Sequence, residues 1–286
     1  MKPEAVERAE RLLGTEAVSW EPVAYRGWSR NEHWTFALAD GTRAFAKEAS
    51  IPPTPDFVRR EAEILALLEA PFAPRLLAFE DGERPLLVLE DLSPGAHWPP
   101  PWRPGDVELV LTTLAEVAET TLEGLTPFPR LLAWAEIAAD PEPFLSLGVA
   151  SPGWVERTAP ALAEAEAHAP IDGDALVHCD VRSDNLCLRG GRAVLVDWNW
   201  ARRGNPALDL AYWLPTLTLE GGPWPAEIAP DLPGGLVAML AGFFASHAHL
   251  PPPEGAPLVR GFQLDQLRVA LPWACESLGL EPPDGL

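Results

Sequence analysis

Residues 176–200 carry the side chains whose types and spacing point most directly to chemistry. The segment contains His178-x-Asp180-x-x-x-x-Asn185, and Asp197 follows the next apolar run. This spacing is typical of a phosphoryl-transfer loop, in which the aspartate accepts a hydroxyl proton and the asparagine binds a metal ion. We therefore predict Asp180 as the catalytic base, with Asn185 and Asp197 as metal ligands.

The dipeptide Gly190-Gly191 separates two short apolar runs and predicts a β-hairpin with a two-residue turn. Counting outward from the turn, Asn185 faces Val196, so Asn185 and Asp197 emerge together at the open end. A hard cation held by a few protein oxygens and completed by phosphate oxygens, as Mg²⁺ usually is, fits this position. Asn and Asp also end strands as ordinary turn formers. Their occurrence beside the loop residues upstream favours the metal site.

Residues 178–180 offer an alternative metal site. His178, Cys179 and Asp180 are adjacent, and all three are metal-ligand types. Neighbouring side chains on an extended segment point in opposite directions, which disfavours that interpretation.

Lys47 is the only internal lysine in a chain with two lysines and 19 arginines. It ends a predicted strand that follows a hairpin turn at Asp40-Gly41, and strand alternation places it on the same face as Phe45. A buried ammonium needs an anionic partner. Apolar residues recur at helical spacing over 56–70, and Glu61 lies on their stripe. We predict a Lys47–Glu61 ion pair, with a solvent-reaching lysine and a surface glutamate as the alternative.

The turn at 25–31 lies between two extended segments and contains Gly27, Ser29 and Asn31. Its backbone N–H groups are candidates to close over phosphates. A single glycine in seven residues is not the Gly-x-Gly-x-x-Gly pattern, and taken alone it is more typical of an ordinary turn. The main support for a phosphate-binding role is the order along the chain, because this turn precedes the strand that carries Lys47.

The apolar run after Pro85 predicts a buried strand that leads into a Pro/Gly-rich stretch. The backbone from Glu90 to Leu92 is placed to offer a carbonyl and an amide to the edge of an adenine. Because the composition changes here, we predict a domain boundary. The expected domains are a nucleotide-binding lobe, residues 1–92, and a catalytic and acceptor-binding lobe, residues 93–286.

Taken in order, these features resemble the aminoglycoside phosphotransferase and choline kinase-like family, small-molecule relatives of the protein kinases. The resemblance spans nearly the whole chain, from Gly27 to Asp197 and on to the segment Gly204–Trp213. It implies an α+β, bilobal protein-kinase-like fold. A small antiparallel-sheet N-terminal lobe with one main helix would precede a larger, mostly helical C-terminal lobe. It further implies ATP and Mg²⁺ as cofactors, and a role for Asp209 in bracing the catalytic loop.

The chain departs from related kinases at three places. Trp198-Asn199 follows the metal aspartate in place of Phe-Gly, which argues against a protein substrate. No activation loop with an Ala-Pro-Glu anchor follows, so control by phosphorylation of that loop is not expected. Arg182-Ser183-Asp184 stands where many relatives have His-Pro-Gly.

The formal charge of −21 argues against nucleic acid and anionic membranes as partners, because both require clustered Lys and Arg. It favours a cationic acceptor, although an acidic surface also serves solubility. We find no signal peptide and no apolar stretch long enough to span a bilayer, and three cysteines in no framework spacing predict reduced thiols. A cytoplasmic location without an obligate protein partner is expected.

The sequence thus predicts an ATP- and Mg²⁺-dependent small-molecule kinase that acts on a hydroxyl group. An aminoglycoside or another amino-alcohol is the favoured acceptor, while choline, homoserine, a macrolide or a sugar stays open. A non-catalytic nucleotide-binding pseudokinase is the alternative of another class. Several tryptophans of the C-terminal lobe are candidates for cation-π contact with an amine, or simply core residues: Trp134, Trp154, Trp200, Trp213, Trp224 and Trp273.

Overall fold

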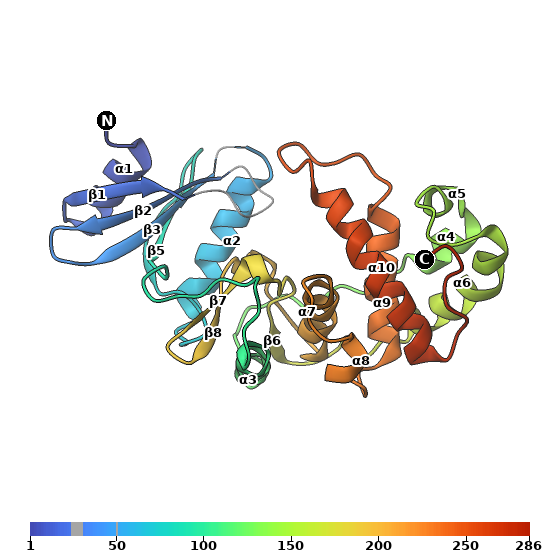
Figure 1. Cartoon of the computed structure of the whole chain (residues 1–286). Helices are drawn as coiled ribbons and strands as arrows, with labels where there is room; N and C mark the ends of the chain where they lie inside the picture. Colours follow the sequence, from blue (N-terminus) through green and yellow to red (C-terminus); the bar gives the residue numbers. More distant parts are fainter. Residues whose placement is uncertain (24–30, 50) are drawn as a thin grey trace. The chain divides into compact units, whose positions relative to one another are not determined.

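The computed structural model describes residues 1–23, 31–49 and 51–286, which form two compact units (Figure 1). Unit 1 comprises Met1–Val117 together with Ser183–Ala201. Unit 2 comprises Ala118–Arg182 together with Arg202–Leu286. The division into functional lobes at residue 92 stays a prediction.

Unit 1 is built on a five-stranded antiparallel sheet with the strand order β1-β2-β3-β5-β4. Figure 1 shows β1, β2 and β3 side by side in this sheet. The buried run of Leu and Val in β5 places that strand in the interior of the sheet. The strands are β1 (Ala17–Pro22), β2 (Glu32–Leu38), β3 (Arg43–Glu48), β4 (Leu76–Glu80) and β5 (Leu86–Glu90).

The turn between β2 and β3 has three residues, 39–41, where the Asp-Gly pair suggested a two-residue turn. Gly41 takes the left-handed conformation with φ 88°, and the amide of Leu38 donates to the carbonyl of Thr42 at 2.8 Å. A three-residue loop that ends in a left-handed glycine is a common hairpin connection. The additional residue sets the register of the pair, so that His33 lies opposite Lys47.

Helix α2 (Thr54–Leu67) begins with a proline in its first turn, where the missing N–H has no intrahelical partner to lose. Its buried stripe includes Val58, Glu61, Ile64 and Leu65, whereas Glu63 is exposed. The helical periodicity read from the sequence is therefore confirmed, and Glu61 is the acidic residue on the buried face.

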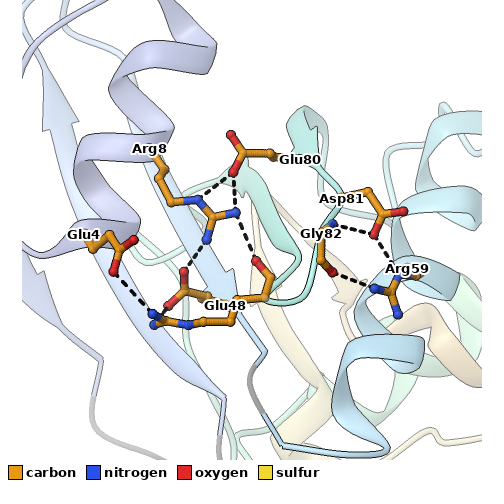
Figure 2. Close-up of polar contacts among 8 residues, drawn as sticks. Glu4, Arg8, Glu48, Arg59, Glu80, Asp81 and Gly82 are labelled. Carbon is orange, nitrogen blue, oxygen red and sulfur yellow. Dashed lines mark hydrogen bonds and ion pairs between the residues drawn. The ribbon is translucent and has the colours of Figure 1, made fainter.

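Helix α1 (Glu4–Leu13) adds a second helix to the sheet and ends at Gly14, which has φ 68°. Ala5, Val6 and Ala9 contribute to the hydrophobic core of the sheet. Figure 2 shows that Arg8 of this helix also reaches Glu48 of β3 and Glu80 of β4. The Glu48 side chain is 1% exposed, so its carboxylate depends on the arginines that pair with it.

The chain returns to unit 1 at Ser183 and forms the hairpin of β7 (Leu186–Arg189) and β8 (Arg192–Leu195). Gly190 and Gly191 have φ values of 59° and 78°, as a two-residue turn of the primed type requires. The predicted register is confirmed, with Leu186 opposite Leu195. Helix α3 (Asp106–Ala118) packs against this hairpin, because Thr113 exchanges hydrogen bonds with the backbone of Ala193 at 3.2 and 3.3 Å.

Unit 2 is mostly helical and contains one short antiparallel pair, β6 (Ala175–Val177) with β9 (Arg202–Gly204). The mostly helical C-terminal part that the family resemblance implied is confirmed here. The unit 2 helices are α4 (Trp134–Ala139), α5 (Glu142–Leu145), α6 (Pro152–Ala167), α7 (Ala207–Leu219), α8 (Pro225–Ile228), α9 (Gly234–His247) and α10 (Val259–Leu278).

Four of the candidate cation-π tryptophans belong to the core of unit 2. Trp134, Trp154, Trp213 and Trp273 are at most 1% exposed, so their rings do not face solvent. Trp200 of unit 1 is 43% exposed, and Trp224 is partly exposed. In the described ranges, no helix is long and apolar enough to cross a membrane.

Candidate active site

A cavity of about 450 Å³ lies within unit 1 and is large enough for a small-molecule ligand. Its walls come from β2 and β3, from the end of β5 with the residues that follow it, and from the segment after β8. Predicted site residues on these walls are Lys47, Glu61, Glu90, Leu92 and Asp197, and the cavity is also lined by His33, Thr35, Phe45, Asp184 and Val196.

Lys47 donates from Nζ to Oε2 of Glu61 at 2.8 Å and also pairs with Oδ1 of Asp197. The predicted Lys47–Glu61 ion pair is thus present. The Lys47 and Glu61 side chains are 9% and 2% exposed, whereas that of Asp197 is 38% exposed. Asp197 therefore keeps an accessible carboxylate, and its backbone amide donates to Oε1 of Glu61 at 3.2 Å.

Electrostatics keep Lys47 charged. Burial acts to lower its pKa, but the carboxylates of Asp197 and Glu61 outweigh burial and raise it. Burial raises the pKa of Glu61, and the Lys47 ammonium opposes that effect. The cation is fixed in position on the cavity wall by these two carboxylates.

Asn185 and Asp197 lie where the hairpin geometry predicted them, at the open end of β7–β8. Asn185 ends the 3₁₀ turn Ser183–Asn185, and its carbonyl accepts from the amide of Val196 at 2.9 Å. One carboxylate and one amide supply hard oxygen ligands and leave room for phosphate oxygens, the donor set that Mg²⁺ prefers. Across the described parts of the chain, no group of three or more His, Cys, Asp and Glu side chains is arranged to hold a metal ion.

The segment after β5 has the backbone groups expected of an adenine hinge. The Asp91 amide donates back to the Arg43 carbonyl at 3.2 Å, which ties the segment to β3. The backbone amide and carbonyl of Leu92 have no hydrogen-bond partner among the described residues. Leu92 and Glu90 both line the cavity.

The phosphate turn is covered only in part. Gly27 and Ser29 lie outside the residues that the structure describes. Asn31 is buried just before β2. The predicted roles of all three in nucleotide binding stay predictions.

The first part of the predicted catalytic loop, residues 178–182, lies in unit 2, where Asp209 braces it as the family resemblance implied. Its Oδ2 accepts from the amide of His178 at 2.9 Å, and its Oδ1 accepts from the amide of Cys179 at 2.8 Å. Burial raises the pKa of Asp209 to about 7, and these two hydrogen bonds oppose the rise. The Asp180 amide donates to Nδ1 of the fully buried His178 at 3.2 Å, so His178 supports the loop from inside.

Two non-glycine residues of the described chain have positive φ, namely Cys179 at 66° and Asp197 at 68°. Left-handed backbone costs an L-residue roughly 1–2 kcal/mol. Such conformations concentrate at functional sites, where the surroundings hold them in place. Here they fall on the residue before Asp180 and on the predicted metal ligand itself.

Arg182 forms an ion pair with Asp180, with 3.2 Å between Nη1 and Oδ1. Its guanidinium also lies over the ring of Phe262 in α10, 5.7 Å from the centroid. The aspartate predicted as the base therefore has a cation beside it. The sequence showed Arg182 only as a departure from the His-Pro-Gly of many relatives.

His33, Thr35 and Phe45 line the cavity, but the sequence did not single them out as site residues. The available signal was strand alternation, which placed Phe45 on the face of Lys47. His33 and Thr35 share that face because they lie opposite Lys47 and Phe45 in the β2–β3 register.

A family model described as the phosphotransferase enzyme family (APH) matches residues 26–242, about three quarters of the sequence. The chain belongs to this phosphotransferase enzyme family. No curated protein matches it at the threshold of the comparison. The match includes Lys47, Glu61, the catalytic loop and Asp197, and it ends within α9.

Solved structures share the fold of this phosphotransferase over nearly their full length. A candidate fructosamine-3-kinase from Thermobifida fusca has 23% identity and a TM-score of 0.59, covering 94% of this chain and 98% of that one. An aminoglycoside phosphotransferase from Alicyclobacillus acidocaldarius has 15% identity and a TM-score of 0.55, covering 98% and 95%. An amicoumacin kinase has 11% identity and a TM-score of 0.55, covering 92% and 91%.

The predicted family, α+β protein-kinase-like fold and enzyme class are confirmed by these comparisons. The chain is a small-molecule phosphotransferase with an antiparallel N-terminal sheet and a helical C-terminal part.

Proposed function

We propose that this phosphotransferase moves the γ-phosphoryl group of ATP, with Mg²⁺, to a hydroxyl group of a small molecule. The observation that carries the proposal is the cation of Lys47 on the cavity wall, held by Glu61 and Asp197. A fixed ammonium beside an accessible carboxylate fits a nucleotide phosphate chain with its metal ion. The amicoumacin kinase of similar fold is in complex with AMP-PNP and Ca²⁺, which supports a nucleotide with a divalent cation.

Each residue has a separate role in this proposal. The backbone of Glu90 to Leu92 binds the adenine edge, and Lys47 contacts the α- and β-phosphates while Glu61 orients it. Asn185 and Asp197 hold Mg²⁺, which supplies charge neutralisation to the phosphates when bound. Asp180 orients the acceptor hydroxyl and accepts its proton.

For the acceptor we propose an amino-alcohol, of which an aminoglycoside is one kind. The formal charge of −21 supports a cationic compound. The burial of four tryptophans removes them as amine-binding faces, so the proposal rests on charge. Choline, homoserine, macrolides and sugars share the same chemistry and belong in the same test.

The test is Mg²⁺-dependent release of ADP from ATP by the purified protein, across aminoglycosides, amino-alcohols, fructosamines, macrolides and sugars. Asp180→Ala should keep ATP affinity nearly unchanged while turnover falls by about 10²-fold or more, because general-base catalysis contributes that much. Asp197→Ala should also weaken Mg-ATP binding, because it loses a metal ligand.

Equal turnover in Asp180→Ala and the unmodified protein would exclude Asp180 as the base. Mg-ATP binding without turnover on any acceptor would favour the non-catalytic nucleotide-binding alternative. Absence of ATP binding would overturn the proposed function as a whole.

A further inference from the structure

His33 lies in β2 directly opposite Lys47 of β3, and both side chains line the cavity of unit 1. Residues opposite each other in an antiparallel pair project from the same face of the sheet. The imidazole also packs on the ring of Phe45, with the ring centroids 5.4 Å apart and the planes inclined at 37°. Phe45 therefore fixes the orientation of the imidazole beside the Lys47 ammonium.

The Nε2 atom of His33 is buried and has no hydrogen-bond partner within the described ranges. Buried polar atoms in folded proteins are nearly always hydrogen-bonded, so an unpaired one in a residue that lines a cavity indicates a partner that a ligand would supply. Burial lowers the pKa of His33 to about 4, with the Lys47 cation adding to this and Asp197 opposing it. At neutral pH the ring is therefore uncharged and one nitrogen carries a hydrogen.

The register of the sheet shows which part of a nucleotide lies beside His33. Ala44 pairs with Glu90, so this level of β3 adjoins the predicted adenine hinge. Lys47 pairs with Leu87, three residues farther along β3 and about 10 Å away at the usual strand rise. His33 shares the level of Lys47, and it is therefore at the phosphate end of the cavity.

We propose that His33 binds the phosphate chain of the nucleotide, with its Nε2–H donating to a phosphate oxygen. This inference rests on the proposed function, because it takes ATP as the occupant of the cavity. Lys47 supplies the charge of the phosphate site. His33 supplies a directional donor whose position Phe45 sets.

The test compares the dissociation constants of Mg-ATP, Mg-ADP and adenosine in titration calorimetry of the full chain. His33→Phe and His33→Leu keep an apolar side chain next to Phe45 and remove the donor. Both should weaken Mg-ATP and Mg-ADP about tenfold or more, as expected for a lost hydrogen bond to a charged group, and change adenosine by less than about twofold. His33→Gln places an amide nitrogen at a reach similar to Nε2 and should restore affinity to within about threefold of the unmodified protein.

His168→Gln is the matched control, since His168 is an exposed residue at the end of α6 and does not line the cavity. The ratio of ATP to adenosine affinity within one variant is insensitive to partial unfolding, which lowers both alike. An unchanged ratio in His33→Phe and His33→Leu overturns the inference, because His33 then has no phosphate contact. Failure of the unmodified protein to bind ATP overturns the proposed function itself, so the two failures are distinguishable.

Discussion

Replacing Lys47 with Met should destabilise the protein through the carboxylate that it leaves behind. The Glu61 side chain is 2% exposed and accepts from Lys47 at 2.8 Å. Removing one partner of a buried ion pair costs about 3–5 kcal/mol, because the remaining charge is neither hydrated nor compensated. Asp197 is 38% exposed, so water can solvate it and we assign it none of this cost. Methionine keeps a similar volume and adds no cavity.

The companion variant Lys47→Met/Glu61→Gln removes both charges and keeps an oxygen for the amide of Asp197. Its stability should return to within about 1–2 kcal/mol of the unmodified protein, since no buried charge remains. The single variant should also depend on pH. Burial raises the pKa of Glu61, and without Lys47 the largest opposing effect is lost, while the hydrogen bond from the Asp197 amide remains. The deficit should therefore be smaller at pH 5 than at pH 8, because lower pH favours the protonated, uncharged form of Glu61.

The assay is urea denaturation followed by tryptophan fluorescence at pH 5 and pH 8, supported by thermal melts. A loss of 3–5 kcal/mol corresponds to a fall in Tm of roughly 6–20 °C for a chain of this size. A Lys47→Met variant within about 1 kcal/mol of the unmodified protein at pH 8 would refute the reasoning. A double variant no more stable than the single one would refute it equally.

Three further changes test other parts of the site and the core. Asp209→Asn can accept from only one of the His178 and Cys179 amides, so kcat should fall by about 10²-fold through a displaced loop, with Mg-ATP affinity retained; kinetics with unchanged kcat would contradict this. Glu166 is fully buried and burial raises its pKa to about 7. Because the folded state holds that proton more tightly than the unfolded chain, stability should fall by roughly 1.4 kcal/mol per pH unit between about pH 5 and 7. In Glu166→Gln the free energy of unfolding, measured from denaturation curves, should lack this fall with pH. An equal dependence on pH in both proteins would contradict the raised pKa of Glu166. Cys179→Gly relieves a left-handed residue and should leave Tm unchanged or higher, whereas a fall worth more than about 1 kcal/mol would show that the buried thiol matters more than the strain.

The parts of the site that sequence could predict are those governed by local rules. The Gly190-Gly191 turn admits one register, which placed Asn185 opposite Val196, the residue that precedes Asp197. A helical stripe and the need of a buried ammonium for a counter-ion were sufficient to pair Lys47 with Glu61.

The place of His33 could not be derived in the same way. Counting from a two-residue turn at Asp40-Gly41 pairs Trp34 with Lys47, and that register puts His33 on the opposite face. The loop has one more residue, which shifts the register so that His33 meets Lys47. Loop length depends on backbone conformation that an Asp-Gly pair does not determine.

Sequence patterns could not predict the long-range ion pairs either. Arg8 and Glu48 lie 40 residues apart, and the sequence contains many other arginines and acids that are equally compatible with pairing. The core roles of Trp134 and Trp213 likewise became evident only once the helices of unit 2 were packed. Composition gives the number of arginines, acids and tryptophans, but tertiary packing determines which of them form ion pairs or are buried.

Phe262 lies in α10, beyond the stretch 26–242 that matches the family, yet its ring lies under the guanidinium that pairs with Asp180. The environment of Asp180, the predicted base, is thus assembled partly from a helix that the shared family stretch does not include. The sequence of such a helix can change during evolution while the proposed phosphoryl-transfer residues within 26–242 stay the same. On the proposed function, exchanging α10 would change the surroundings of Asp180 while leaving Lys47, Glu61 and Asp197 in place.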